Sequence, residues 1–270
     1  VKLLITIEFY NIIIFFIFYI TGYEPFSLVA FLKKLLPITS VKSSFYACYL
    51  IFFLCVPFLN ILINQMSRKM YLFLIGILSF TYIILGTIPK VEVTMNYVSW
   101  FCVLYFISAY VRCYPIKLFQ NTKLWGVMTC FSVLTSIGSI LICAYFRIDK
   151  AYYFVNDSNK ILAVLTGFCF FMFFKNVKIK YNRFINIIAS TTFGILMIHA
   201  NSDTMRRWLW KDILHNPSMY GNEYMVLHAC FCVIVVFITC SIIEIIEKPI
   251  MNKLDRGFFE SVEKWYKNLS

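Results

Sequence analysis

The segment STTFGILMIHANSDTMRRWLWKD, residues 190–212, carries the residue types best suited to chemistry in this chain. If one helix continues past residue 200, His199, Asp203 and Arg207 follow one another at i,i+4 spacing and share a face with Arg206. An aspartate at that distance orients an imidazole and stabilises its charged form, as acid–base sites require. The pattern predicts a polar rim at the end of an apolar helix or, as the alternative, an interfacial helix with an internal salt bridge.

A second polar face lies in WFCVLYFISAYVRCYP, residues 100–115. Tyr105, Ser108 and Arg112 stand at i, i+3 and i+7, so they share one side of a helix. A guanidinium at that position can hold a phosphate through two parallel hydrogen bonds. The alternative is an arginine that extends to the lipid headgroups while its methylene groups stay in the apolar layer.

Two further polar groups interrupt apolar runs. Asn60 follows Pro57 in SFYACYLIFFLCVPFLN, and a proline inside a helix frees a backbone carbonyl and can produce a kink beside a cavity. A simple packing kink below a belt of interfacial tyrosines explains this pattern equally well. Glu8 and Asn11 lie within the first apolar segment, where they are either near an interface or paired inside a bundle.

The composition identifies the class of protein. Of 270 residues, 61% are hydrophobic and 14% are charged, which is too apolar for the surface of a water-soluble globule. Because no alternating strand segments occur, a helical bundle is favoured over a membrane barrel. The net charge of +12 comes from Lys and Arg spread over the connections, which indicates contact with membrane lipids and not with nucleic acid. The sequence therefore predicts an all-α, polytopic transmembrane helical bundle, with its ten cysteines as small buried hydrophobes.

The apolar runs set the number of spans, because a bilayer core about 30 Å thick needs about 20 apolar residues per helix. This length predicts about eight spans, at residues 3–20, 45–63, 71–88, 98–115, 124–146, 160–175, 184–200 and 224–245.

The basic residues predict the orientation in the cell membrane. The N-terminus, the even connections and the tail carry 15 of the 25 Lys and Arg residues, so the positive-inside rule places both termini in the cytoplasm. The connections 21–44 and 201–223 then face outward, and FLKKLLPI in the first of them is typical of an amphipathic interfacial helix. The expected organisation is a transmembrane domain over residues 1–245 and a short, helical cytoplasmic tail over 246–270.

Four stretches resemble the acyltransferase-3 family, the integral membrane O-acyltransferases of bacteria that modify surface polysaccharides. STTFGILMIHANSD is similar to the family's late F-G-I-x-x-I-H helix, and IIEIIEKPI to its closing I-E-x-P. SFYACYLIFFLCVPFLNILI resembles its aromatic-Y-x-x-x-Y…P-F-L-N helix, and VSWFCVLYFISAYVRCYP its W-F…Y-F-x-x-A-Y-x-R helix. The matches follow the family's order and cover nearly the whole chain.

The resemblance implies transfer of an acyl group, usually acetyl, from acetyl-coenzyme A to a hydroxyl of a polysaccharide or lipid-linked glycan, with no bound cofactor or metal. It implies that Arg112, with Tyr105 and Ser108, helps to hold the coenzyme-A phosphates. His199, Asn201, Asp203, Arg206 and Arg207 would then form the rim where glycan hydroxyls approach. His199 is expected to orient the substrate as a hydrogen-bond donor, since the family's usual base is a histidine in its first helix.

That first-helix histidine and the F-F-x-x-S-G signature of the next helix have no counterpart here, and His215 and His228 lie elsewhere. The chain is therefore expected to lack the family's first two helices, which leaves the catalytic residue unassigned and the activity open. The alternative is a non-enzymatic membrane protein, such as a polysaccharide transporter or an accessory subunit, and a third reading is an inert fragment.

Overall fold

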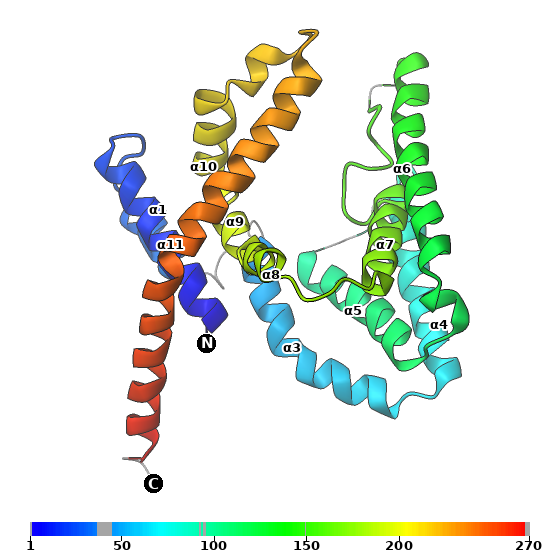
Figure 1. The fold of residues 1–270 in the computed structure, drawn as a ribbon, viewed down its shortest axis with the longest axis horizontal. Helices are drawn as coiled ribbons and strands as arrows, with labels where there is room; N and C mark the ends of the chain where they lie inside the picture. Colours follow the sequence, from blue (N-terminus) through cyan, green and yellow to red (C-terminus); the bar gives the residue numbers. More distant parts are fainter. Residues whose placement is uncertain (1, 37–44, 92, 94–95, 149, 268–270) are drawn as a thin grey trace. The chain divides into compact units, whose positions relative to one another are not determined.

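The structure is a computed structural model that describes residues 2–36, 45–91, 93, 96–148 and 150–267. Within these ranges the regular structure is entirely helical, so the predicted all-α class is confirmed (Figure 1). Residues 37–44 of the predicted outward connection and 268–270 of the predicted tail lie outside the described residues.

The helices follow one another along the chain with short connections. In order they are α1 (Lys2–Ile20), α2 (Leu28–Leu35), α3 (Phe45–Gln65), α4 (Arg68–Ser79), η2 (Phe80–Leu85), α5 (Tyr97–Cys113), η3 (Lys117–Gln120), α6 (Thr122–Tyr145), α7 (Ile161–Asn176), α8 (Arg183–Ala189), α9 (Thr192–His199), α10 (Asp203–Arg207), η4 (Trp208–Ile213), η5 (Asn216–Met219) and α11 (Met225–Lys267).

Helices occupy all eight segments predicted to span the membrane, but not all eight have the length and apolarity of a full span. Among the described residues, five do: α1, α3, α4 with η2, α6 and the first part of α11, Met225–Lys253. A sixth arises if the bent pair Arg183–His199 and Asp203–Ile213 counts as one span. The long apolar helices are those of a membrane protein, and their exposed apolar side chains can contact lipid.

The two shorter apolar helices, α5 and α7, have 17 and 16 residues. The side chain of Asn96 caps the start of α5 by accepting a hydrogen bond from the amide of Ser99. The helix ends at Cys113, two residues before Pro115, because a proline disfavours helical geometry in the residue before it. The cap starts α5 one residue before the predicted span 98–115, and Pro115 ends it two residues early.

The chain folds as two compact units. The terminal unit combines Val1–Ala47 with Tyr181–Ser270, and the central unit is Cys48–Lys180. The long helix α11, coloured orange to red in Figure 1, continues through residue 246 without a break, so the predicted tail is helical as far as Lys267 and continuous with the last apolar segment.

In the terminal unit, the core forms where α1 and α11 pack on α9. The side chains of Ile7, Tyr10, Ile14 and Phe18 recur every three to four residues of α1 and are all buried, so they form one helical face. They meet Ile195 and other apolar residues of α9 and α11 in one cluster. This packing fixes the helices that carry the polar residues described below.

In the central unit, α6 packs against α7, and the hydroxyls of Ser136 and Thr166 lie 3.2 Å apart across this pair. The short π-helix η2 follows α4 directly, and the backbone hydrogen-bonding pattern changes there. Beside it, Asn159 donates to the carbonyl of Tyr82 over 3.0 Å. Lys160 donates to the carbonyl of Gly86 over 2.6 Å, so both of these backbone acceptors have a side-chain donor.

Candidate functional site

The apolar helix that carries His199 does not continue past residue 200. Helix α9 ends at His199, and α10 begins at Asp203 after a bend of 93°. Ser202 takes an extended conformation and its hydroxyl accepts a hydrogen bond from the amide of Met205 over 3.1 Å, which caps the new helix. The predicted i,i+4 relation between His199 and Asp203 is therefore wrong, because no single helix contains both residues.

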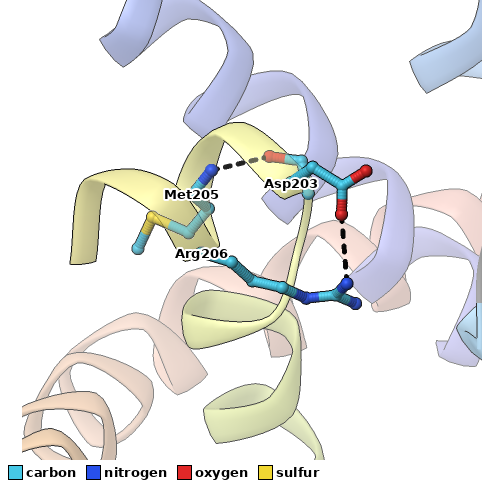
Figure 2. Close-up of polar contacts among 4 residues, drawn as sticks. Asp203, Met205 and Arg206 are labelled. Atoms are coloured by element: carbon cyan, nitrogen blue, oxygen red, sulfur yellow. Dashed lines mark hydrogen bonds and ion pairs between the residues drawn. The ribbon is translucent and has the colours of Figure 1, made fainter. Parts of the chain in front are cut away.

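The ion pair of Asp203, in the exposed part of the predicted rim, also differs from the predicted one. Asp203 forms an ion pair of 3.1 Å with Arg206, at i,i+3 spacing (Figure 2), in place of the predicted contact with Arg207. The side chains of Arg206 and Asp203 are 51% and 97% exposed, so solvent screening leaves this pair about 0–1 kcal/mol. The pair marks the start of α10 and does not organise His199.

Arg207 points toward a different element. Its guanidinium carbon lies 5.6 Å from the ring centre of Tyr23, in the loop that follows α1. The hydroxyl of Tyr23 donates to the carboxylate of Asp212, and this hydrogen bond raises the pKa of the phenol. These contacts join the connection after α1 to the segment that follows the bend.

His199 is held in one orientation by its own helix. Its Nδ1 lies 2.6 Å from the carbonyl oxygen of Ile195. Because a carbonyl can only accept, Nδ1 carries the hydrogen and the neutral ring keeps Nε2 as an acceptor. The edge of the ring contacts Trp210, with centroids 6.5 Å apart. The neutral imidazole therefore offers an acceptor, whereas the resemblance implies an orienting donor.

Asn201 lies at the bend and belongs to a closed set of buried polar contacts. Its amide nitrogen donates to Oδ1 of Asn11 over 2.9 Å, and Nζ of Lys34 donates to its Oδ1 over 3.0 Å. The amide of Asn11 in turn donates to the carbonyl of Lys34 over 3.2 Å. Asn11 is completely buried and Asn201 is 4% exposed. We call these three residues the Lys34–Asn11–Asn201 centre.

The sequence predicts an interfacial helix around Lys34, and in the structure the Lys34 side chain extends to Asn201. Helix α2 is present and its N-cap, Ser27, accepts from the amide of Ala30. Lys33 is exposed, whereas the half-buried Lys34 reaches Asn201. An ammonium has three donor hydrogens, and this contact uses one of them. The centre therefore holds a positive charge beside the end of the His199 helix.

The pH dependence of stability tests the burial of Lys34. Burial lowers the pKa of Lys34, and the charges of Glu24 and Asp203 oppose this effect. Between the lowered pKa and the ordinary value of about 10.4, the unfolded chain binds more protons, so the free energy of unfolding rises with pH. We expect Lys34→Met to lose this rise and Lys33→Met to keep it, as measured by thermal unfolding over the alkaline range. An unchanged slope in Lys34→Met would contradict the assignment.

The residues predicted to bind phosphate lie in the central unit. Tyr105 donates to Oδ1 of Asn60 over 2.7 Å, which joins α5 to α3. Ser108 donates to the carbonyl of Tyr105 over 3.0 Å, within its own helix. Arg112 is exposed at the end of α5. The structure thus separates the predicted site residues into two groups, one in each unit.

Ser108 also borders a mostly apolar cavity of about 400 Å³ in the central unit, whose walls include Trp100, Phe168 and Phe171. Among the described residues, no group of three or more His, Cys, Asp or Glu side chains is arranged to hold a metal ion. Five cysteines, Cys48, Cys143, Cys169, Cys232 and Cys240, are buried as predicted, while Cys113, Cys130 and Cys230 are exposed.

Comparison of the chain with protein-family models, curated proteins and solved structures finds no match. The resemblance to the acyltransferase-3 family therefore rests on the four stretches of sequence quoted above.

Proposed function

We propose that the protein is an integral membrane O-acyltransferase. In this proposal it moves an acyl group, acetyl in the simplest case, from acyl-coenzyme A to a hydroxyl of a cell-surface polysaccharide or a lipid-linked glycan. The observation that carries the proposal is the bend after His199. The bend places Asn201, in contact with Lys34 and Asn11, directly after a histidine whose Nδ1 is bound to Ile195 and whose Nε2 is an acceptor.

The roles proposed for these residues follow from their hydrogen-bonding capacity. Nε2 of His199 accepts the hydrogen of the glycan hydroxyl, whose oxygen attacks the thioester carbonyl. The C–O bond forms as the C–S bond breaks, the coenzyme-A thiolate leaves, and the proton passes from the imidazole to that thiolate. The ammonium of Lys34 stabilises the negative charge that develops on the carbonyl oxygen. Asn201 and Asn11 hold that ammonium in place.

The donor side of the proposal uses the central unit. Arg112 offers an exposed guanidinium, whose planar fork suits a phosphate of coenzyme A. Tyr105 and Ser108 precede it on α5. The proposed membrane orientation, with both termini in the cytoplasm of the cell, places the predicted connection 201–223 on the outside, where a surface glycan is available.

One observation favours a second candidate function, a transporter of polysaccharide or its lipid-linked precursor. Secondary transporters bind their substrates at interrupted helices, and the pair Arg183–His199 and Asp203–Ile213 is interrupted by a bend of 93°.

The experiment that tests the proposal uses the protein reconstituted in liposomes with acetyl-labelled coenzyme A and a lipid-linked glycan. We expect label on the glycan in an ester bond that mild alkali releases. Movement of the glycan across the bilayer with no label on it would support the transporter and contradict the transferase. Empty liposomes, prepared in the same way, are the control for spontaneous transfer.

A further inference from the structure

Three polar side chains meet in the core of the terminal unit, apart from the Lys34–Asn11–Asn201 centre. The hydroxyl of Tyr10 in α1 contacts Oε2 of Glu244 and lies 2.8 Å from Oε2 of Glu247, both in α11. The two glutamates are at i,i+3 spacing and therefore share a face of that helix. Tyr10 is 3% exposed and Glu247 is 7% exposed. We call these three residues the Tyr10–Glu244–Glu247 cluster.

The cluster has fewer hydrogens than its oxygen atoms require. A tyrosine hydroxyl has one hydrogen and can donate it to only one carboxylate at a time. Two carboxylate oxygens nevertheless contact it, so one of them faces the hydroxyl oxygen without a donor. In addition, Oε1 of Glu247 is buried and has no hydrogen-bond partner among the residues that the structure describes. With both glutamates ionised, the cluster also holds two like charges in apolar surroundings.

No basic side chain in the described part of the chain forms an ion pair with Glu244 or Glu247. On α11 itself, Lys248 donates to the hydroxyl of Ser190 over 2.5 Å, and Cys240 is one turn before Glu244. Among the described side chains of α11, no cation therefore neutralises the negative charge of Glu244 and Glu247.

Among the described side chains, no cation of a neighbouring helix forms an ion pair with the cluster either. On α1, the other ionisable residues are Lys2, the first residue of the helix and eight residues before Tyr10, the acid Glu8, and Tyr19. On α9, the ionisable residue is His199, which bonds to the carbonyl of Ile195 and contacts Trp210. The segment η5, Asn216–Met219, which also contacts α11, has no ionisable side chain.

The backbone of α9 leaves room for the cluster at one position. A Cβ atom added to Gly194 would overlap the carboxylate of Glu244. Glycine at this position therefore allows the carboxylate to lie against the α9 backbone. No side chain of residue 194 stands between Glu244 and that backbone.

We infer that Tyr10, Glu244 and Glu247 form a binding site for one small monovalent cation, a proton or Na⁺, between α1 and α11. A proton on one carboxyl supplies the missing hydrogen and removes one negative charge. Na⁺ would likewise neutralise one negative charge, with the two carboxylates and the phenol oxygen as its ligands. The neighbouring residue Asn11 contacts Asn201, so the site is joined by one peptide bond to the Lys34–Asn11–Asn201 centre. The inference does not depend on acyl transfer.

The test labels membrane-buried carboxyl groups with the apolar reagent dicyclohexylcarbodiimide, which reacts with protonated carboxyls. The full chain in liposomes is treated over a range of pH, in choline chloride or in NaCl, and the modified peptides are identified by mass spectrometry. We expect an adduct on Glu244 or Glu247 that falls about tenfold per pH unit above the titration midpoint. Loss of the adduct in NaCl but not in choline chloride assigns Na⁺, and indifference to the two salts assigns the proton.

Variants separate this result from general reactivity. Glu247→Gln supplies the missing donor as an amide, so we expect it to fold and to lose most of the adduct. Glu223→Gln, which changes an exposed carboxyl, should leave the adduct unchanged. As a second measurement, the unfolding temperature of the wild type should depend on pH or Na⁺ more than that of Glu247→Gln. No adduct on either glutamate at any pH, or an adduct that responds to neither pH nor Na⁺, would overturn the inference.

Discussion

Replacement of His199 by alanine is expected to slow acyl transfer by about 10²–10⁴-fold, the usual contribution of a positioned acid–base group. The physical reason is the fixed imidazole, whose Nδ1 is bound to the carbonyl of Ile195 and whose Nε2 remains an acceptor. Alanine removes that acceptor. The measurement is the initial rate of label transfer to the glycan at saturating acetyl-coenzyme A, so that the effect is seen in kcat rather than in donor binding.

His215→Asn is the matched control for this variant. His215 is an exposed histidine in the same unit with a positive φ of 49°, a conformation that asparagine tolerates. We expect its transfer rate to equal that of the wild type. A rate in His199→Ala within a factor of about two of the control would remove His199 from the proposed chemistry, provided that both variants show the wild-type unfolding temperature.

The largest expected effect on stability comes from Gly194→Ala. Its new methyl group would overlap the carboxylate of Glu244, which must then move away from α9. Glu244 also contacts the hydroxyl of Tyr10, so the displacement disturbs the packing of α1, α9 and α11 together. We expect a loss of about 1–3 kcal/mol, as in other overpacked cores. Thermal unfolding in detergent, followed by the exposure of buried cysteines, measures it.

Gly138→Ala is the control for the glycine itself. Gly138 lies inside α6, and a Cβ atom there would meet nothing within 4 Å. Since alanine favours a helix over glycine by about 1 kcal/mol, this variant should be as stable as the wild type or more so. Equal destabilisation by the two substitutions would show that the approach of Glu244 to Gly194 is not the cause.

Hydropathy predicts the helices well because it depends on composition over a long window. Every predicted span is largely helical, although 184–200 consists of two helices, α8 and α9, since an apolar segment of this length satisfies its backbone groups best as a helix. The full length of a span is less predictable. Local signals decide it, such as the Asn96 cap and Pro115 at the two ends of α5.

The sequence contains a local signal for the bend after His199, but a hydropathy average over a long window does not detect it. Ser202 followed by Asp203 is a typical helix start, with a hydroxyl cap and an acid in the first turn. The apolar pattern before it and the tryptophans after it instead favour one continuous helix. The Ser202 cap therefore determines how the predicted polar residues are arranged. Asp203 pairs with Arg206 in the structure, whereas one continuous helix predicts a pair with Arg207.

The Lys34–Asn11–Asn201 centre could not be predicted from spacing. Its contacts join residues separated by 23, 167 and 190 positions in the chain, and periodicity reports only on neighbours within one helix. Asn11 can be noticed in the sequence as a polar residue in an apolar segment, but its partners depend on how α1, α2 and the bend pack together. The same holds for Tyr10, which meets Glu244 across 234 positions.

A double-variant cycle on the transfer rate tests the central claim, that His199 and the Lys34–Asn11–Asn201 centre act on one reacting group. Transfer is measured for the wild type, His199→Ala, Lys34→Met and the combined variant, with Lys33→Met as the control for loss of a lysine from α2. Residues that act as a unit are strongly non-additive. We therefore predict that the combined variant is as slow as the slower single variant, within about twofold. A combined loss equal to the product of the two single losses, or no loss in Lys34→Met, would contradict the account.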